Sequence, residues 1–302
     1  MSQAHTPSLS DPAAFEDELP DTPPRGKVAA NLRRLVRHRS SRFGLAVLGV
    51  IVVLALFGQW IVPYDPLELN MGARLQPPSA AHWFGTDELG RDLLSRIVAG
   101  TRYFLLVSGV SIAIAASGGI VLGLIAAGGG RWADMIVMRV VDVMLSFPYV
   151  LLLLAVIAIL GPSLTTAMVA VGTAAIPGFA RLVRGEALSV RETEYVEAMR
   201  VLGAGPLRIT LGTILPNIMS PIVIYASYSM PLAVLSAAAL SFLGLGAQPP
   251  LPEWGAMLVQ SRTFLRSAWW IVAAPGFAIF FSILGMNLLG NAIRDVLDTR
   301  TR

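Results

Sequence analysis

Six long apolar runs, separated by shorter polar segments, dominate the hydrophobic pattern of the chain. A helix needs about 20 mostly apolar residues to cross a hydrocarbon core of roughly 30 Å, and each run has about that number or more. The runs cover residues 43–61, 103–127, 132–160, 163–183, 218–243 and 269–289. The pattern therefore predicts an all-α integral membrane protein with six transmembrane helices.

The third run is long enough to raise a further expectation. Its 29 residues (132–160) would form one helix of about 43 Å at 1.5 Å per residue, which exceeds the hydrocarbon core. The start of this helix should therefore lie at the inner membrane surface. Arg139 and Asp142 are three residues apart there and are predicted to form an interfacial ion pair, with a proton relay as the alternative.

Composition agrees with a membrane protein and excludes cysteine chemistry. Charged residues make up 14% of the 302 residues and the mean hydropathy is +0.66, whereas soluble domains have roughly 25% charged residues. The chain has no cysteine, so a disulfide framework and a thiolate metal site are both excluded.

The basic residues predict how the chain crosses the membrane. Seven of them precede the first run: Arg25, Lys27, Arg33, Arg34, Arg37, Arg39 and Arg42. The positive-inside rule places this N-terminal segment in the cytoplasm, and six spans return the C-terminus to the same side. Under that topology 17 of the 23 Lys and Arg residues are cytoplasmic, the others being Arg74, Arg91, Arg96, Arg102, Arg262 and Arg266. The first run is too long for a signal peptide and is interpreted as a retained span.

Small and polar residues within the runs indicate how the helices pack. Gly119 and Gly123 form a GxxxG pair, which favours close approach of two helices in lipid. The fifth run is rich in hydroxyl groups, and five of them are candidates for lining a transport path: Tyr225, Ser227, Tyr228, Ser229 and Ser236. Helix packing is the alternative interpretation, because polar groups within spans face either a bundle interior or a water-filled cavity.

No catalytic or metal site is predicted. Residues 87–92 contain three acids, Asp87, Glu88 and Asp92, but they lack the spacing of a calcium loop and are interpreted as part of a structured surface segment. HExxH and GxSxG motifs are absent from the runs, which argues against an intramembrane enzyme.

A charged segment between the fourth and fifth runs, residues 189–216, contains the pattern of a bent helix pair. Ser189 and Glu192 have capping-box spacing, which predicts a helix that begins near Val190. Gly203 suits the left-handed residue that ends a helix, and Pro206 suits the first position of the next helix. The predicted apolar face consists of Tyr195, Ala198, Met199 and Leu202, and the charged residues off this face are Glu194, Glu197 and Arg200.

An amphipathic helix of this kind can lie on the lipid surface or dock in the groove of a partner protein. Lipid binding favours Lys and Arg on the polar face, whereas acids are at least as frequent as bases here. Docking is therefore preferred. A short helix between two spans can then transmit the movement of a soluble partner to the membrane helices.

The same segment resembles the EAA loop of ABC importer permeases, whose pattern is Glu-Ala-Ala, three residues, Gly, nine residues, Ile, one residue, Leu-Pro. Glu197, Ala198, Gly203, Leu215 and Pro216 match in register. Met199 replaces the second Ala and Thr213 replaces the Ile. Further stretches, including "FGTDELGRDLLSR" (84–96) and "SFLGLGAQPPLPEWGAML" (241–258), resemble the C-type permease subunit of dipeptide, oligopeptide and nickel importers.

The resemblance implies the fold of a type I importer permease like that of methionine importers, with residues 102–302 as the core. Residues 43–101 would add one N-terminal span and an extracytoplasmic segment, and residues 1–42 a cytosolic tail. The implied location is the plasma (inner) membrane of a prokaryote, with both termini in the cytoplasm.

The resemblance also implies the partners. These are a B-type permease subunit as heterodimer partner, two cytosolic ATPase subunits that bind ATP and Mg²⁺, and an extracytoplasmic substrate-binding protein. No cofactor is expected on this chain, which lacks a GxxxxGK[ST] phosphate loop, and no nucleic acid is expected as a partner.

Peptides are the cargo that the resemblance favours, with nickel or glutathione-like solutes as alternatives. A self-sufficient secondary transporter or channel is the alternative class. Ion-coupled transporters hold ionisable groups near the bilayer midplane, and the middle of the runs has essentially none.

Overall fold

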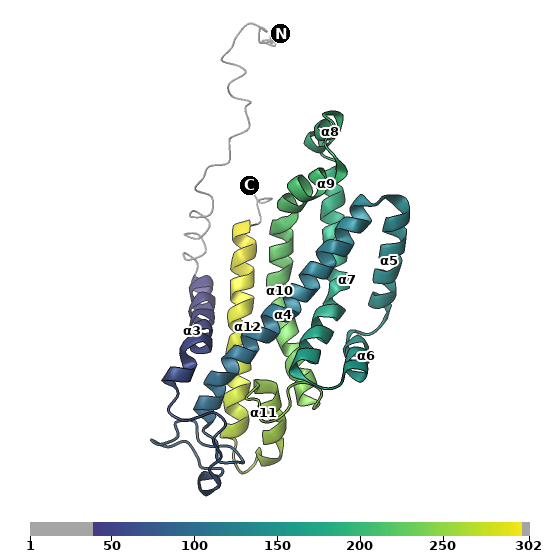
Figure 1. Ribbon diagram of the computed structural model, residues 1–302. Helices are drawn as coiled ribbons and strands as arrows, with labels where there is room; N and C mark the ends of the chain where they lie inside the picture. The colour runs from purple at the N-terminus through teal and green to yellow at the C-terminus, as the bar shows by residue number, and fades with distance from the viewer. Residues whose placement is uncertain (1–38, 298–302) are drawn as a thin grey trace, which may run out of the picture.

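The computed structural model describes residues 39–297, which form helices joined by turns and short irregular segments (Figure 1). The helices are α3 (Arg39–Ile61), η1 (Met71–Ala73), α4 (Leu93–Gly128), α5 (Gly130–Ser146), α6 (Tyr149–Leu160), α7 (Leu164–Arg191), α8 (Glu194–Val201), α9 (Pro206–Ile209), η2 (Thr210–Ile214), α10 (Leu215–Phe242), α11 (Trp254–Ser261), η3 (Arg262–Phe264) and α12 (Trp270–Leu297). The predicted N-terminal tail lies outside the described residues, except for its last four positions.

Five helical segments within residues 39–297 are long and apolar enough to cross a membrane, and a bent helix pair raises the number to six. The five are α3, α4, α7, the continuous segment from α9 to α10, and α12. The bent pair is α5 and α6. This confirms the all-α membrane fold that the six apolar runs predict.

The third run is not the single helix that its length suggests. α5 ends at Ser146, α6 begins at Tyr149, and the two helices are bent by 96°. Pro148 has no N–H to donate and disfavours the helical conformation at Phe147, which is extended (φ −81°, ψ 140°). Pro148 then caps α6, accepting a backbone hydrogen bond from Leu151 at 2.9 Å.

Two other helices extend beyond their apolar runs because polar residues continue them. α4 begins at Leu93, ten residues before the expected start, where Asp92 caps it by accepting a hydrogen bond from the Ser95 N–H at 2.8 Å. α7 continues to Arg191, eight residues past the end of the fourth run. Both extensions contain charged residues, Arg96 in α4 and Arg184 and Glu186 in α7, that interrupt the apolar pattern without ending the helix.

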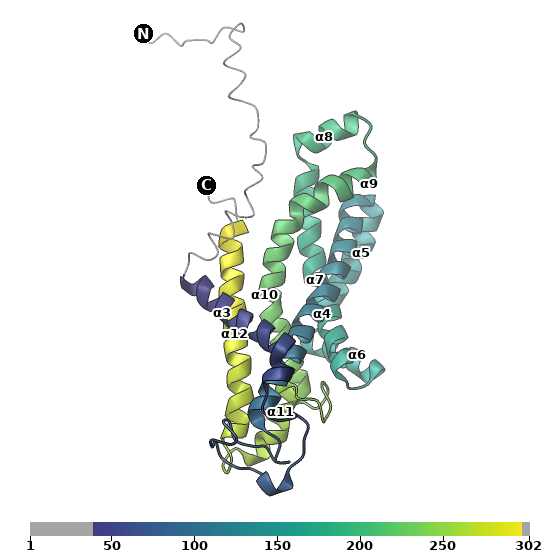
Figure 2. The ribbon, with the colours of Figure 1, turned by 60° about the vertical axis from the view of Figure 1, so that its left-hand side comes forward.

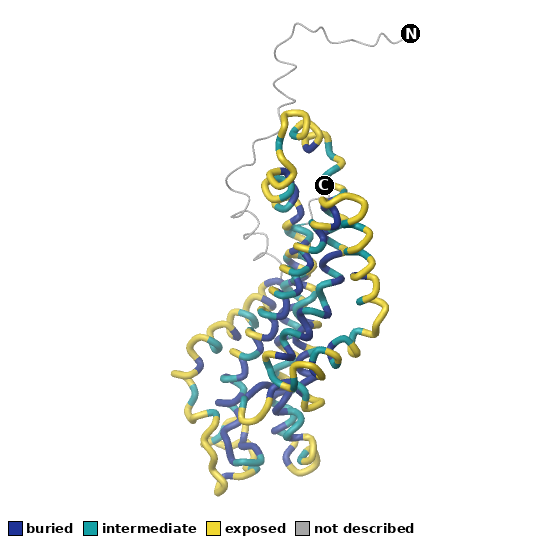
Figure 3. The backbone as a smooth tube through the Cα atoms, turned by 45° about the vertical axis from the view of Figure 1, so that its right-hand side comes forward, coloured by how far each residue is buried: buried dark blue, intermediate teal, exposed yellow. Residues whose placement is uncertain are grey.

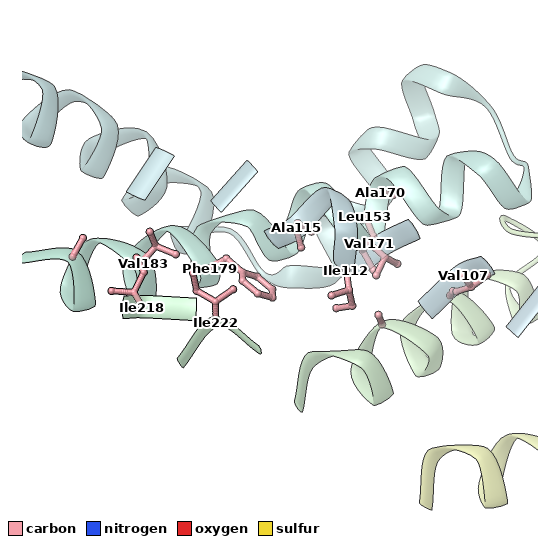
Figure 4. Close-up of a cluster of buried hydrophobic side chains, with 14 of the residues drawn as sticks. Val107, Ile112, Ala115, Leu153, Ala170, Val171, Phe179, Val183, Ile218 and Ile222 are labelled. Carbon is pink, nitrogen blue, oxygen red and sulfur yellow. The ribbon is translucent and has the colours of Figure 1, made fainter. Parts of the chain in front are cut away.

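The main core lies where α4 packs along α7, with α10 beside them (Figure 4). Gly119 and Gly123 of α4 make this close contact possible. A Cβ atom added at Gly119 would lie 2.2 Å from Phe179 Cβ, and one added at Gly123 would lie 2.6 Å from Val183 Cβ. The predicted GxxxG contact is therefore confirmed, and it joins α4 to α7.

The segment between α3 and α4 forms a polar cap at the same end of the molecule as α11, called here the α11 end (Figures 1 and 2). Asp87 accepts hydrogen bonds from the backbone of Leu89 and Arg91 and pairs with the Arg91 side chain at 2.6 Å. Asp92 binds Ser95 and the His82 ring. These acids hold the cap in place, as expected of a structured surface segment.

The opposite end of the molecule carries α8 and is called here the α8 end. The described chain both starts and ends on this side, since α3 begins there at Arg39 and α12 ends there at Leu297 (Figures 1 and 2). Buried residues lie mainly within the helical body, whereas α8 and the turn after it are largely exposed (Figure 3).

Candidate coupling site

α8 begins four residues later than the capping-box pattern predicts. Ser189 belongs to the last turn of α7, which continues to Arg191, so a helix start near Val190 is wrong. Thr193 is the N-cap of α8, and its hydroxyl donates to the Val190 carbonyl at 2.6 Å. The break between α7 and α8 is therefore only two residues long.

Val196 fixes α8 to the body of the protein. Its side chain is completely buried and Met199, three residues later, is half-buried. Tyr195, Ala198 and Leu202 of the predicted apolar face are exposed, as a face that docks on a partner requires, whereas Met199 is turned partly toward the protein. Val196 and Met199 form one short stripe that packs against the rest of the protein, and the other side of α8 is exposed.

Gly203 ends α8 as the sequence predicts. Its φ angle is +81°, and two backbone hydrogen bonds close the turn, from Gly203 N–H to Arg200 O and from Ala204 N–H to Met199 O, both at 3.0 Å. These bonds form a Schellman motif, in which the left-handed position favours glycine. Pro206 then starts α9 at its first position, so the predicted helix, turn and helix are confirmed.

The two departures from the EAA pattern contact each other. The Thr213 hydroxyl lies 3.4 Å from the Met199 sulfur. Thr213 belongs to η2, a π-helical turn, and its carbonyl accepts a hydrogen bond from Asn217 Nδ2 at 2.8 Å. Leu215 is half-buried and Pro216 is exposed at the start of α10. Met199 and Thr213 together therefore join α8 to the base of α10.

The outward side of α8 and the turn after it form a surface that we call the coupling surface. It contains the exposed charged residues Glu194, Glu197 and Arg200 together with Tyr195, Ala198, Val201, Leu202 and Leu207. Val201, Leu202 and Leu207 are 83%, 85% and 76% exposed. An apolar cluster so open, rimmed by charges, is typical of a protein interaction site.

Val201 and Leu207 were not predicted to belong to this surface. They flank the Gly203 turn and fall outside the helical spacing of the expected apolar face. The signal that could have identified them is their position beside the glycine that ends the helix. A short turn of this kind offers few contacts that could bury apolar side chains.

Ion pairs connect α5 to α7 in the half of the molecule nearer α8. The Nε and Nη2 groups of Arg184 donate hydrogen bonds to the two carboxylate oxygens of Asp134. The Nη2 group of Arg181 donates to Asp142 Oδ1 at 2.6 Å. The predicted pair between Arg139 and Asp142 is therefore wrong. The bend after Ser146 leaves α5 as a short separate helix alongside α7, so Asp142 meets Arg181 across the contact.

The five candidate path-lining residues of α10 have different environments. Tyr225 and Tyr228 are 36% and 38% exposed, and Ser229 and Ser236 are half-buried. The Tyr228 hydroxyl donates to Asn291 Oδ1 of α12 at 3.0 Å. Ser227 is 9% exposed and its hydroxyl donates to Ile224 O of its own helix. Burial favours helix packing for Ser227, and path lining stays a prediction for the others.

The described residues contain no group of three or more His, Asp or Glu side chains that is arranged to hold a metal ion. At the α8 end, the anchored helix α8 presents charged and apolar side chains outward.

A family model described as "binding-protein-dependent transport system inner membrane component" matches residues 119–302. A second model, described as the N-terminal transmembrane domain of oligopeptide transport permease C, matches residues 29–78.

Curated relatives match along most of their length. A dipeptide transport system permease protein of Alkalihalophilus pseudofirmus is 44% identical over 89% of both chains. A di/tripeptide permease of Pseudomonas aeruginosa is 44% identical over 86% of this chain and 88% of its own. A glutathione transport system permease of Pectobacterium atrosepticum is 43% identical over 89% of this chain and 90% of its own.

Among solved structures, the MetNI methionine ABC transporter in inward-facing conformations has a similar fold. One of its chains superimposes with a TM-score of 0.55 at 22% identity, covering 68% of this chain and 97% of that chain.

Proposed function

The chain belongs to the family of binding-protein-dependent transport system inner membrane components, and from this premise we propose that it forms half of the translocation path of an importer of small peptides. It is a membrane-spanning permease subunit of an ABC importer, with the fold of the MetNI permease. The sequence-based expectation of such a permease is thereby confirmed. The cargo, the partners and the coupling role rest on the arguments that follow.

The geometry of α8 is the observation that supports the proposed coupling role. Val196 buries one side of the helix, and the coupling surface leaves the other side open. A partner that grips this surface pulls directly on α7 through a two-residue break and on α10 through Met199 and Thr213. Both of these helices are membrane-spanning candidates, so movement of the partner reaches the helices that cross the bilayer.

The proposed partners supply what this chain lacks. Cytosolic ATPase subunits would bind ATP and Mg²⁺ and would dock on the coupling surface. A second, B-type permease would complete the path, and an extracytoplasmic binding protein would deliver the substrate to the α11 end. This assignment places the α8 end and both termini in the cytoplasm of a prokaryotic cell, in agreement with the distribution of Lys and Arg.

Peptides of two or three residues are the proposed substrates. The relatives named for dipeptides and for di/tripeptides support this class. The relative named for glutathione supports a second candidate, since glutathione is itself a small peptide-like molecule. Nickel chelates are an alternative that competition experiments can separate from both.

The coupling role is tested with a charge reversal on α8. In the purified, reconstituted complex, Glu197→Lys places a positive charge on the exposed side of the first turn of α8. ATP hydrolysis should become independent of substrate, and uptake of a labelled dipeptide should be lost. Glu68→Lys makes the same charge change at an exposed position of the α11 end and should leave coupling intact. Normal coupled uptake by Glu197→Lys would contradict the proposed role.

The partners and the cargo are tested on the native complex. Purification of the tagged chain in mild detergent should recover a second permease, ATPase subunits and a binding protein. Dipeptides should compete for uptake more strongly than glutathione or nickel chelates. Transport by this chain alone after reconstitution would instead support a self-sufficient transporter and overturn the proposal.

A further inference from the structure

A groove of about 900 Å³ lies between α3 and α4 near the α11 end. Its walls are the last two turns of α3, the extended residues that follow it, and the first part of α4. α3 crosses α12 on its way to this point (Figure 2), and the groove lies where α3 ends beside α4. Both helices are long and apolar enough to span the membrane, so a groove between them is one that lipid can reach.

The deeper part of the groove is apolar. Leu54 and Leu56 of α3 and Leu105 and Leu106 of α4 line it. Leu54 is seven residues before the end of α3, so this wall extends about 10 Å into the membrane below the helix end. Phe57 and Trp60, 50% and 71% exposed, flank the outer end of α3, at the level where aromatic side chains mark a membrane interface.

The outer part of the groove is polar and carries two opposite charges. Arg102 lines it from α4, and Asp65 lines it from the segment after α3. Both are exposed. Asp65 accepts a hydrogen bond from the Leu67 N–H, whereas Arg102 makes no hydrogen bond or ion pair within residues 39–297.

The guanidinium donors of Arg102 are therefore available to an anion from outside the chain. Arg102 lies ten residues into α4, level with the last turns of α3, where a guanidinium is costly unless it is solvated or paired. Phosphate is the natural partner, because guanidinium donors match its oxygens in paired hydrogen bonds.

We propose that this groove is a binding site for a phospholipid with a primary-amine headgroup. The phosphate binds Arg102, the ammonium group binds Asp65, and one acyl chain fills the apolar wall formed by α3 and α4. A soluble phosphate would leave that wall uncovered, and an anionic headgroup would place its extra charge beside Asp65. A headgroup with both charges complements both side chains.

The site is tested by lipid retention. The complete importer complex is exchanged into nanodiscs of equal parts phosphatidylethanolamine, phosphatidylcholine and phosphatidylglycerol with identical acyl chains. Lipids that remain after detergent extraction are then counted by native mass spectrometry. The wild-type complex should retain phosphatidylethanolamine above the other two.

Three variants separate the parts of the site, with Arg266→Gln, an exposed arginine of the other outer segment, as control. Arg102→Gln should lower phospholipid retention roughly tenfold, as expected for loss of charge-assisted hydrogen bonds. Asp65→Asn should abolish the preference for phosphatidylethanolamine over phosphatidylcholine. Ala99→Phe, which fills the groove and leaves both charges in place, should also expel the lipid.

Two results would overturn the site. The first is equal lipid retention by the wild-type complex and Arg102→Gln. The second is loss of the second permease from Arg102→Gln complexes with no change in lipid, because the groove would then be a contact between permeases.

Discussion

Gly203 holds the coupling site in shape through its backbone alone. Its φ angle of +81° lies in the left-handed region, where a side chain costs about 1–2 kcal/mol, and no atom within 4 Å of the Cβ position would obstruct one. The requirement is thus conformational rather than steric. Asn tolerates this region better than other non-glycine residues, whereas β-branched residues do so poorly.

Substitutions at Gly203 should therefore follow conformational preference. We expect Gly203→Asn to retain most coupled peptide uptake, and Gly203→Val to lose it while the protein stays in the membrane. The measurement is substrate-stimulated ATP hydrolysis together with uptake in proteoliposomes. Gly205, two residues later, has φ −66° and open space around it, so Gly205→Val is the matched control and should be active. Equal activity of the Asn and Val variants at position 203 would contradict the argument.

Glu253 gives the α11 end a dependence on pH. The carboxylate caps α11, accepting hydrogen bonds from the N–H groups of Gly255 and Ala256 at 3.0 and 2.8 Å. Burial raises the pKa of Glu253 above its ordinary value, and these hydrogen bonds, with one from Ser241, only partly oppose that rise. The folded state therefore binds the proton more tightly than the unfolded state.

The sign of the pH effect follows from the raised pKa. The contribution of Glu253 to stability is complete below the ordinary carboxyl pKa and is lost as the pH rises through the raised one. We expect the wild-type protein to lose thermal stability over this range relative to Glu253→Gln, whose side chain does not titrate. Melting temperatures of both proteins, measured in parallel at each pH, give the difference. A difference that is constant with pH would refute the prediction, whatever the absolute cost of losing a cap.

At the scale of elements, α8 and the π-helical turn η2 depend on each other through Met199 and Thr213. Both positions depart from the EAA pattern, and their side chains touch at 3.4 Å. A longer side chain at one position and a smaller polar one at the other fill a shared space. Residues in contact have non-additive energies, whereas distant residues do not.

A double-mutant cycle tests this dependence. Met199→Ala should leave a gap, and Thr213→Ile, the residue of the family pattern, should crowd the methionine. The double variant should be more stable than the sum of the two single effects by about 1 kcal/mol. The readout is thermal unfolding of the purified complex. Thr210→Ile, in the same turn, combined with Met199→Ala is the control and should be additive.

The sequence predicts those elements whose signals are local. Gly203, Pro206 and the Gly119–Gly123 pair act through backbone freedom or small size, and the structure confirms all of them. Val196 could not be predicted as the anchor of α8, because the rotation of a two-turn helix is set by what packs beneath it. Pro148 is a local signal for a kink, but a bend as large as 96° could not be predicted from an apolar run that continues without interruption on both sides.

At the scale of the whole molecule, the bend does not change how often the chain crosses the bilayer. If α5 and α6 together make one crossing, the described residues cross six times. This agrees with the structure, in which α3 begins and α12 ends on the side of α8 (Figure 1). The hydrophobic pattern thus correctly predicts an even number of crossings, although it misses the bend in the third span.

Orientation can be tested directly because the chain contains no cysteine. Leu69 and Met71 at the α11 end are 63% and 62% exposed, and Leu202 at the α8 end is 85% exposed. In right-side-out membrane vesicles, a membrane-impermeant maleimide should label Leu69→Cys and Met71→Cys. It should leave Leu202→Cys unlabelled until the vesicles are opened.

A docked ATPase could also shield Leu202, so a second position at the α8 end is needed. Arg131→Cys, at an exposed position in the first turn of α5, should show the same protection from outside as Leu202→Cys. Labelling of both α8-end positions in sealed vesicles, with protection of both α11-end positions, would reverse the orientation. The coupling surface would then face away from ATP, and the proposed role of α8 would fail with it, because only a cytosolic surface can be gripped by an ATPase.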